Sequence, residues 1–380
     1  MKASILIVAG ENSGEKYGAD LVYQFKKLQS SFSFFGIGGK HMEKEGVHLL
    51  FPVEALSIVG GIEVISHLPR VRNIFNRIKK EIKLQKPIVS ILIDSPDFNL
   101  RLAKKLKKHS IPVLYYISPT VWAWRKRRLR SIKNTIERMM LIFPFEEKIY
   151  KEHKIPAVYV GHPLKERVKA SLSKEEFLQK YGFDPEKKLI ALLPGSRKSE
   201  LKYHMPILLK AVKKIKKEYP AQFVLILAES LNKNLLADFI PPHFNELKVI
   251  TENGYEAVAS SELALSACGT ANLEAALLET PVVSFYRISP LSYHIGVRFV
   301  TIKNYSIVNI LAGKRIIPEL IQKGFSPENI FQEAKKILDS ERIQSEMIEE
   351  FRKIKQILGD EIASKNAAQE LEKLIKKKTA

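Results

Sequence analysis

Residues 188–200 read KLIALLPGSRKSE and show the pattern that decides the fold. An apolar run typical of a buried strand ends in a turn that contains glycine, and the residues after the turn begin a helix. The same alternation of strand and helix recurs along the chain, so the sequence predicts parallel sheets covered by helices on both faces. The expected strands lie at residues 3–10, 32–39, 87–95, 112–118, 188–196, 222–230, 247–251, 262–269 and 281–286, with one more ending at Phe143.

A polar stretch at residues 165–188 has few strand formers and divides this alternation into two halves. We therefore expect an α/β protein with two Rossmann-like, doubly wound domains, at residues 1–165 and 166–345. Ligands of such domains bind at the carboxyl ends of the strands and in the cleft that the domains face. Residues 346–380 are charged and favour helix, which predicts a C-terminal helical tail.

The chain has 380 residues, 45% of them apolar, and a formal net charge of +21. This apolar fraction excludes a disordered protein, and no run approaches the roughly 18 uncharged apolar residues that a membrane-spanning helix needs. The apolar run near the start lacks a small-residue cleavage site, so we expect a buried strand and not a signal peptide. A single cysteine, Cys268, permits no internal disulfide and fits a reducing cytoplasm. The positive charge calls for an anionic partner: nucleic acid, phospholipid or a phosphorylated substrate.

Most of that charge lies in one segment, because residues 70–133 hold 18 basic and three acidic side chains. Apolar residues recur at helical spacing from Val71 to Ile82, with Lys79, Lys80 and Lys83 among the basic residues between and after them. A basic amphipathic helix beside the apolar segment 56–70 is typical of a protein that lies in an anionic membrane interface. A surface helix with a solvated basic face is the alternative.

The turn in LLPGSRKSE, residues 192–200, has the features of an anion site. Gly195 lets the backbone approach a ligand, Ser196 can cap the new helix, and the N–H groups at a helix N-terminus favour anions. Arg197 adds a cation whose fork geometry suits phosphate. An ordinary turn between a strand and a helix is the alternative.

A second turn of this kind lies in SACGTANLEAALLETP, residues 266–281. Gly269 and Thr270 form the turn, and Glu274 follows about one helical turn later, where a carboxylate can accept hydrogen bonds from ribose hydroxyls. Two anion sites in one domain fit a nucleoside diphosphate better than either does alone. Cys268 has no local His or Lys to activate it, so we expect a small buried residue and not a nucleophile.

In the N-terminal half, IDSPDFN places Asp94 and Asp97 after a strand in the most basic part of the chain. Asp94 is a candidate general base for a hydroxyl group. Asp97 is a second candidate, with capping of the next helix as its alternative role. The turn GENSGE, residues 10–15, departs from the three spaced glycines of dinucleotide-binding proteins, so no nicotinamide cofactor is expected.

Both tryptophans precede a basic run in SPTVWAWRKRRLRSIK, residues 118–133. Trp124 and Arg125 are candidates for stacking a base, or for holding a phosphate beside an apolar channel. Packing of Trp122 and Trp124 within the domain is the alternative. His162 follows a strand, and structural and functional roles stay open for it. No metal-ligand cluster is apparent, so a diphosphate leaving group would be neutralised by helix N-termini and Arg197 without a divalent ion.

Taken together, the motifs closely resemble the lipid-A-disaccharide synthase family, inverting glycosyltransferases of the two-domain GT-B type. The resemblance rests on blocks that run in order across residues 5–325: AGENSGEKYGA, GIGGKHMEKEG, IVGGIEVISHLP, IDSPDFN, YYISPTVWAWRKRR, FPFEEKIY, VGHPLKE, LLPGSRKSE, SACGTANLEAALLETPVV and YSIVNILAGKRIIPELIQ. It implies transfer of 2,3-diacylglucosamine from UDP to the 6-hydroxyl of 2,3-diacylglucosamine 1-phosphate, with a β-1,6 linkage and release of UDP. It also implies a cytoplasmic protein, peripheral on the inner membrane of a Gram-negative bacterium.

The resemblance also assigns roles to residues. Asp94 would be the base, Ser13 and Glu15 would lie near the reacting sugar, and three residues would line the UDP site: Arg197, Glu274 and Asn309. Two positions depart from the family pattern, which usually has Asp where Glu15 stands and SGT where this chain has ACGT. The first keeps a carboxylate, and the second keeps Gly269 and Thr270.

Other functions remain open at this stage. Another UDP-sugar enzyme of the same fold, such as an epimerase or a peptidoglycan glycosyltransferase, would share the UDP domain. A nucleic-acid-binding protein would explain the charge, but it would spread basic residues along a groove and bind with a steep dependence on salt. The lipid assignment implies no nucleic-acid partner and leaves a homodimer open.

Overall fold

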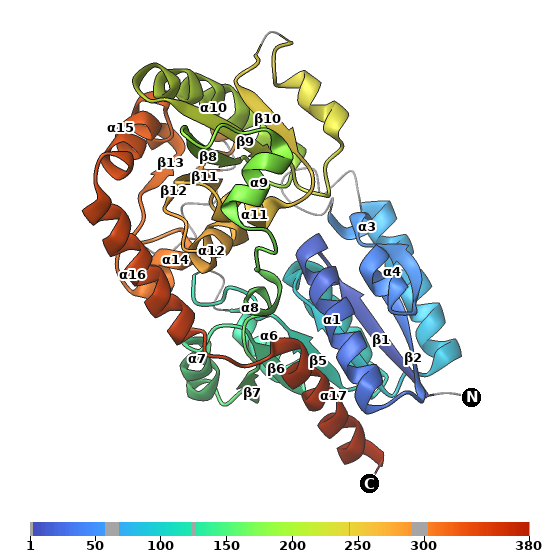
Figure 1. Ribbon diagram of the computed structural model, residues 1–380. Helices are drawn as coiled ribbons and strands as arrows, with labels where there is room; N and C mark the ends of the chain where they lie inside the picture. The colour runs from blue at the N-terminus through green and yellow to red at the C-terminus, as the bar shows by residue number, and fades with distance from the viewer. Residues whose placement is uncertain are drawn as a thin grey trace. The chain divides into compact units, whose positions relative to one another are not determined.

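The computed structural model describes residues 3–57, 68–123, 127–242, 244–290, 293 and 303–379. They form two compact units, each with its own parallel sheet (Figure 1). The N-terminal unit holds the described residues up to Pro163 and those from Asp360 onward, and the C-terminal unit holds the described residues between them. The two units divide between Pro163 and Leu164, close to the expected boundary at residue 165. The expected tail, residues 346–380, is shared between the two units.

The N-terminal sheet has seven parallel strands in the order β3-β2-β1-β4-β5-β6-β7. Its strands are β1 (Ala3–Ala9), β2 (Phe32–Gly38), β3 (Val47–Pro52), β4 (Val89–Ile93), β5 (Val113–Tyr116), β6 (Arg138–Leu141) and β7 (Ala157–Tyr159). Strands β1, β4 and β5 are almost wholly apolar and buried, because helices cover both faces of the sheet. The strand order reverses between β1 and β4, which is where doubly wound sheets bind ligands.

The helices of this unit are α1 (Asn12–Leu28), α2 (Lys40–Lys44), α3 (Glu54–Ser57), α4 (Leu68–Gln85), α5 (Pro96–Lys108), α6 (Arg128–Thr135), α7 (Glu146–Glu152) and α17 (Ala363–Thr379), while α8 (Pro163–Arg167) lies at the boundary. The basic amphipathic helix of the sequence is α4. Its apolar residues, including Ile74, Ile78 and Ile82, are buried in the core, and its lysines are exposed. The apolar face of α4 is therefore not available for a membrane, and the surface-helix alternative describes its packing correctly. Residues 58–67, the middle of the apolar segment 56–70, lie outside the described residues.

The C-terminal sheet has six parallel strands in the order β10-β9-β8-β11-β12-β13. Its strands are β8 (Lys188–Leu193), β9 (Ala221–Ile226), β10 (Leu247–Ile250), β11 (Leu263–Ala267), β12 (Val282–Tyr286) and β13 (Glu319–Ile321). The helical elements are α9 (Lys174–Tyr181), α10 (Lys198–Glu218), η2 (Lys233–Asp238), α11 (Gly254–Ala259), α12 (Thr270–Leu277), α14 (Ile307–Ala312), η3 (Gln322–Gly324), α15 (Pro327–Leu338) and α16 (Glu341–Ile357). Here the order reverses between β8 and β11.

The sequence did not predict β3 and β13, each of which lies at one of the two edges of its sheet. Most residues of β3 remain partly exposed, and β13 has three residues. A strand paired on one side only needs no continuous apolar run, so its sequence carries a weaker signal than a central strand.

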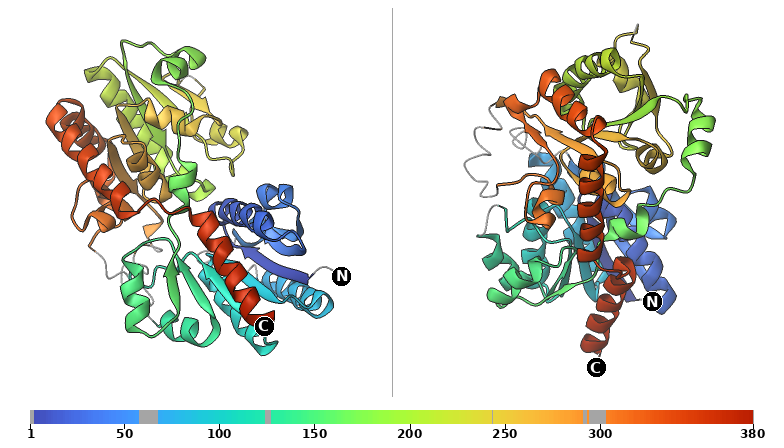
Figure 2. Two further views of the ribbon diagram at one scale, coloured as in Figure 1. Left: turned by 60° about the horizontal axis from the view of Figure 1, so that its bottom comes forward. Right: turned by 60° about the vertical axis from the view of Figure 1, so that its left-hand side comes forward.

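The last helix, α17, packs along α1 in the N-terminal unit (Figure 2). It buries an apolar stripe that includes Ala367, Leu371 and Ile375. Polar contacts anchor it along its length. The Asn366 amide donates to the Val160 carbonyl oxygen (3.1 Å), and Arg138 pairs with Glu370 (2.6 Å). This helix is therefore part of the N-terminal core and not a tail.

We expect Leu371→Ala to lower the free energy of unfolding of the N-terminal unit by about 2–5 kcal/mol, because it leaves a cavity under α17. Urea unfolding followed by tryptophan fluorescence measures this unit, since both tryptophans of the chain lie in its sequence. Leu84→Ala is the matched control, because the Leu84 side chain is 66% exposed. Equal unfolding curves for the two variants would show that α17 adds nothing to the core.

Candidate active site

The topology brings two predicted motifs of the N-terminal unit to one place. GENSGE follows β1 and IDSPDFN follows β4, and these strands are hydrogen-bonded neighbours at the reversal of strand order. The Gly10 N–H donates to the Ile93 carbonyl oxygen (3.3 Å), and a Cβ on Gly10 would lie 1.9 Å from the Ser95 Cβ. Glycine is therefore required at position 10 for the close approach of the two turns.

Asp94 sits at this reversal in a strained backbone. Both Asp94 and Ser95 have left-handed φ angles, 53° and 43°. The Asp94 carbonyl oxygen accepts from the Asn99 amide (2.8 Å) and from the Tyr115 hydroxyl (2.6 Å), and its N–H donates to the Tyr116 carbonyl oxygen (3.0 Å). Backbone strain that neighbouring groups hold in place is concentrated at functional sites. The half-buried Asp94 side chain is thus presented by a rigid support.

Tyr115 remains a hydrogen-bond donor in this support. Burial raises the pKa of its hydroxyl well above the usual value, and the negative charge of Asp94 raises it further. Tyr115 therefore keeps its proton throughout the neutral range and can hold the Asp94 carbonyl oxygen.

The second carboxylate of the motif, Asp97, lies in an exposed position in the first turn of α5. Its Oδ1 pairs with the Arg128 guanidinium at 2.5 Å. The N-cap of α5 is Ser95, in the left-handed conformation, so the expected capping position is not that of Asp97. Asp94 is thus the more buried and more constrained of the two candidate bases.

Glu15 is buried and both of its carboxylate oxygens are engaged within the unit. Oε1 contacts the His41 Nδ1 at 2.5 Å, and Oε2 accepts from the Met42 N–H at 3.2 Å. A Cβ on Gly39 would lie 2.8 Å from the Glu15 Cδ, so the carboxylate occupies the start of α2. Glu15 therefore connects α1 to α2. Ser13 lies half-buried in the first turn of α1.

In the C-terminal unit, both predicted anion loops also lie at the reversal, because β8 and β11 are neighbours. Gly195 has a φ of +120°, and a Cβ there would lie 2.3 Å from the Glu200 Oε2. The same oxygen accepts from the N–H groups of Ser196 (2.8 Å) and Arg197 (3.2 Å). The N-cap of α10 is Arg197 and not Ser196, because Glu200 satisfies the turn. A carboxylate of the chain thus occupies the place expected for an anion, and the Arg197 side chain is exposed.

The loop after β11 is open. Gly269 and Thr270 are exposed at the start of α12, and a Cβ on Gly269 would meet nothing within 4 Å. Glu274 lies one helical turn later. Burial raises the pKa of Tyr255, and the negative charge of Glu274 raises it further. Burial raises the pKa of the Cys268 thiol to about 12, so this cysteine is not a nucleophile at neutral pH.

Asn309, on α14, is fully buried and uses its whole hydrogen-bonding capacity within the unit. Its amide donates to the Ile317 carbonyl oxygen (3.0 Å) and to the Glu319 Oε1 (2.8 Å). Its oxygen accepts from the N–H groups of Ile316 (2.8 Å) and Ile317 (3.0 Å). Asn309 therefore shapes the segment between α14 and β13, and it has no donor or acceptor left for a ligand.

His204 is a site residue that the sequence analysis missed. Its Nδ1 lies 2.7 Å from the Pro194 carbonyl oxygen, and its Nε2 accepts from the Arg287 N–H at 3.0 Å. Burial lowers the pKa of His204, and a neutral ring with the proton on Nδ1 satisfies both contacts. The ring joins the Pro194–Gly195 turn to the end of β12. The signal in the sequence was its place four residues after Glu200, one helical turn along α10.

Trp124 and Arg125 lie outside the described residues. Trp122 is half-buried, donates from Nε1 to the Glu146 Oε1 (3.2 Å) and meets the Phe145 ring edge to face at 5.4 Å. Trp122 thus packs within the N-terminal unit, which is the alternative to ligand binding given above.

Burial lowers the pKa of His162 to about 3, so this ring is neutral, and it packs on Phe143. The structure gives His162 a place in the packing.

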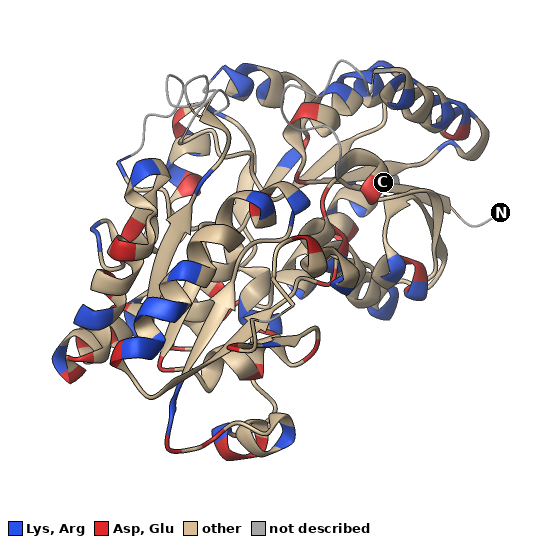
Figure 3. Ribbon diagram, turned by 90° about the horizontal axis from the view of Figure 1, so that it is seen from above, with Lys and Arg blue, Asp and Glu red and all other residues tan. Residues whose placement is uncertain are grey.

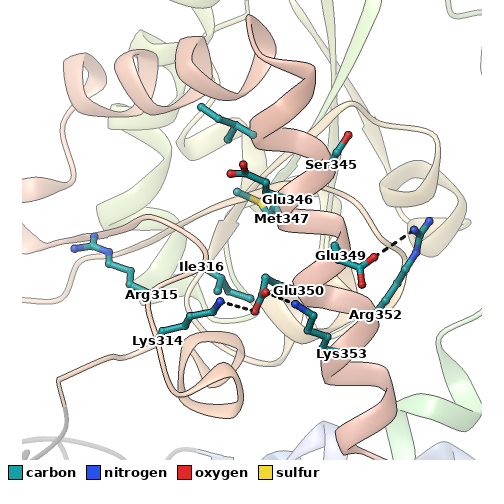
Figure 4. Close-up of a pocket in the computed structure, with 11 residues that line it drawn as sticks. Lys314, Arg315, Ile316, Ser345, Glu346, Met347, Glu349, Glu350, Arg352 and Lys353 are labelled. Atoms are coloured by element: carbon teal, nitrogen blue, oxygen red, sulfur yellow. Dashed lines mark hydrogen bonds and ion pairs between the residues drawn. The ribbon is translucent and has the colours of Figure 1, made fainter.

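A hollow of about 720 Å³ lies on the C-terminal unit, between residues 314–316 and α16, and Figure 4 shows the side chains that line it. Its side chains largely pair among themselves, as Glu350 does with Lys314 (3.1 Å) and Lys353 (2.7 Å). No predicted site residue lines it, so we do not assign it to the active site.

Across the described ranges, no three His, Cys, Asp or Glu side chains are grouped to hold a metal ion. None of the helices in those ranges is long and apolar enough to cross a membrane.

Two doubly wound parallel units define the GT-B class of glycosyltransferases, and solved structures share this fold over nearly the whole chain. One is the UDP-GlcNAc 2-epimerase from Neisseria meningitidis bound to UDP-GlcNAc, with a TM-score of 0.66 and 14% identity over 98% of this chain and all of that one. Another is the calicheamicin glycosyltransferase CalG4, with a TM-score of 0.62 and 11% identity over 99% of this chain and 98% of that one. At these identities the likeness concerns the fold alone.

Sequence comparison identifies the family. A family model described as lipid-A-disaccharide synthetase matches residues 5–373. The lipid-A-disaccharide synthase of Syntrophus aciditrophicus is 42% identical over 98% of both chains, and that of Nitrosococcus oceani is 40% identical over 93% of this chain and 92% of its own. The chain belongs to the lipid-A-disaccharide synthase family, and it is a glycosyltransferase of lipid A biosynthesis. The resemblance seen in the sequence is confirmed.

We expect Asn309→Asp to lower the free energy of unfolding by about 3–5 kcal/mol, because it places a second carboxylate against Glu319 in a buried site. Urea unfolding followed by circular dichroism measures the change. Asn234→Asp is the control, since Asn234 is exposed, and it should alter stability by less than about 0.5 kcal/mol. Similar stability of the two variants would mean that Asn309 does not hold the segment between α14 and β13.

Proposed function

We propose that this enzyme transfers 2,3-diacylglucosamine from its UDP conjugate to the 6-hydroxyl of 2,3-diacylglucosamine 1-phosphate. The products are the β-1,6-linked disaccharide 1-phosphate and UDP. The observation that carries the proposal is the family match over residues 5–373, together with a constrained carboxylate, Asp94, at the reversal of the N-terminal sheet.

In the proposed mechanism, Asp94 takes the proton of the acceptor hydroxyl as its oxygen attacks the anomeric carbon of the donor. The bond from that carbon to the diphosphate breaks on the opposite face, which inverts the configuration, and UDP leaves. Asp94 suits this role because its backbone is held by three hydrogen bonds, so the carboxylate needs little reorganisation. Asp97 is less suited, because it is exposed and paired with Arg128.

We assign UDP to the C-terminal unit. The guanidinium of Arg197 and the N-terminus of α12, at Gly269 and Thr270, would stabilise the departing diphosphate. Glu274 would accept from the ribose hydroxyls. The N–H groups of Ser196 and Arg197 already donate to Glu200, so they would contribute only if Glu200 moved. Asn309 would act indirectly, through the segment that it holds.

Asp94→Asn should lower the turnover number at least about 100-fold while UDP binding is retained, given the usual contribution of a general base. Asparagine tolerates a left-handed backbone as aspartate does, so the fold should be preserved. The assay measures release of UDP from UDP-diacylglucosamine, with and without the phosphorylated acceptor.

Asp97→Asn is the matched control and should retain most of the activity. Near-normal turnover of Asp94→Asn would move the base to Asp97 or Glu15. Absence of acceptor-dependent release of UDP by the unaltered enzyme would refute the proposed reaction itself.

We further propose that the enzyme binds an anionic membrane surface, on the cytoplasmic face of the inner membrane, through the exposed basic face of α4. Lys and Arg residues, blue in Figure 3, lie mostly on helices. Because the apolar face of α4 is buried in the core, this binding would be electrostatic and would weaken as salt is added.

Replacing Lys79, Lys80 and Lys83 by Gln should therefore weaken binding to vesicles, at about 1 kcal/mol for each lysine near the surface. Co-sedimentation with vesicles of phosphatidylglycerol and phosphatidylcholine measures the effect, and UDP affinity should stay unchanged. The control replaces three exposed lysines of α10, Lys210, Lys216 and Lys217, and removes the same charge. Equal vesicle binding by the two variants would contradict a role for α4.

A further inference from the structure

A buried polar cluster supports the loop that follows β5 in the N-terminal unit. Glu146, in the first turn of α7, is 1% exposed, and its Oε1 accepts from the Trp122 indole at 3.2 Å. The Ser118 hydroxyl lies 2.7 Å from the Tyr150 hydroxyl, and Tyr150 is fully buried one turn along α7. The loop thus rests on α7 through polar contacts at both Ser118 and Trp122.

The described surroundings of Glu146 hold this carboxyl group without a charge-balancing partner. Its Oε2 is buried and makes no hydrogen bond to any residue in the described ranges. An ionised carboxylate with one oxygen in that state is strongly disfavoured, whereas the protonated form avoids the charge. Burial raises the pKa of Glu146 to about 8, although the Trp122 indole and the nearby polar groups of Ser118, Phe143 and Ile142 oppose the shift.

Among the residues that the structure describes, the titratable groups around Glu146 do not supply a charge at neutral pH. Burial raises the pKa of Tyr150 on α7, and burial keeps His162, beyond Phe143, neutral. The neighbouring charged residues of α7, Glu147 and Lys148, are exposed to solvent.

The supported loop lies next to Asp94. It begins at Ile117, a β-branched residue with a left-handed φ of 70°, a conformation that such residues rarely adopt. The carbonyl oxygen of the preceding residue, Tyr116, accepts a hydrogen bond from the Asp94 N–H. The Tyr115 hydroxyl donates to the Asp94 carbonyl oxygen. A shift of this loop would therefore be transmitted to the support of the candidate base.

We propose that Glu146 is a positioning residue whose uncharged carboxyl group clamps the Trp122 indole and fixes residues 117–123 beside Asp94, where the phosphorylated acceptor sugar binds. This inference rests on the proposed function for the identity of the acceptor. Its physical part, an uncharged carboxyl group that holds Trp122, does not depend on any substrate.

The first test measures tryptophan fluorescence against pH in the full chain carrying Trp124→Phe, so that Trp122 is the only tryptophan. We expect a transition near pH 8 as Glu146 ionises. Adding Glu146→Gln should abolish it, since the amide keeps an acceptor for the indole but cannot ionise. Adding Glu152→Gln, which removes an exposed carboxylate from the same helix, should leave the transition in place. A transition that persists in Glu146→Gln would overturn the assignment.

The second test separates positioning from general stability. In the UDP-release assay, Glu146→Gln should keep KM for the acceptor within about threefold at pH 7 and should lose the fall in kcat/KM above pH 8. Glu146→Leu, which cannot accept from the indole, should raise that KM about tenfold and also lower kcat, with little change in UDP affinity. Equal KM values for the Gln and Leu variants would overturn the clamp.

If Glu146→Leu does not fold, Trp122→Phe removes the same hydrogen bond from the other side, and the same rise in KM is expected. An enzyme without acceptor-dependent UDP release would refute the proposed reaction, while the fluorescence titration would still decide whether Glu146 is the ionising group.

Discussion

Both units depend on one constraint of parallel sheets. A central strand covered on both faces offers no place for an unpaired polar side chain along its length, so polar groups gather where strands end. At β1 and β4, and again at β8 and β11, the strand order reverses and the following loops lead to helices on opposite faces. The motifs GENSGE, IDSPDFN, LLPGSR and SACGT all follow these four strands. The position of the candidate active site is thus a consequence of strand order.

Much of this arrangement could be predicted, because central strands and the glycine turns after them carry strong local signals. The sequence analysis found the two units and the motifs at each reversal, and it missed β3 and β13 because edge strands need no continuous apolar run. It also predicted a basic amphipathic helix at α4 and left open whether this helix lies at a membrane or on the surface, since periodicity reveals an apolar face but not what covers it. In the structure the core covers it.

The polar residues of the predicted motifs differ in whether they form their hydrogen bonds within the chain, and the sequence could not show this. Glu15, Glu200 and Asn309 form hydrogen bonds with neighbours within their own unit. Such pairings join residues far apart in the chain, as with Glu146 and Trp122 or His204 and Arg287, so no local pattern records them. Polar residues in a motif therefore divide into those that build the turn and those that face the ligand.

The return of α17 to the N-terminal unit has a consequence for how the chain is made. A ribosome releases residues 3–163 first, but the helix that covers α1 leaves it only after the whole C-terminal unit has emerged. Domains generally fold as units in the order of their synthesis. Here the part of α1 that α17 covers stays uncovered until the C-terminal unit has been made, so the half made first is the half completed last.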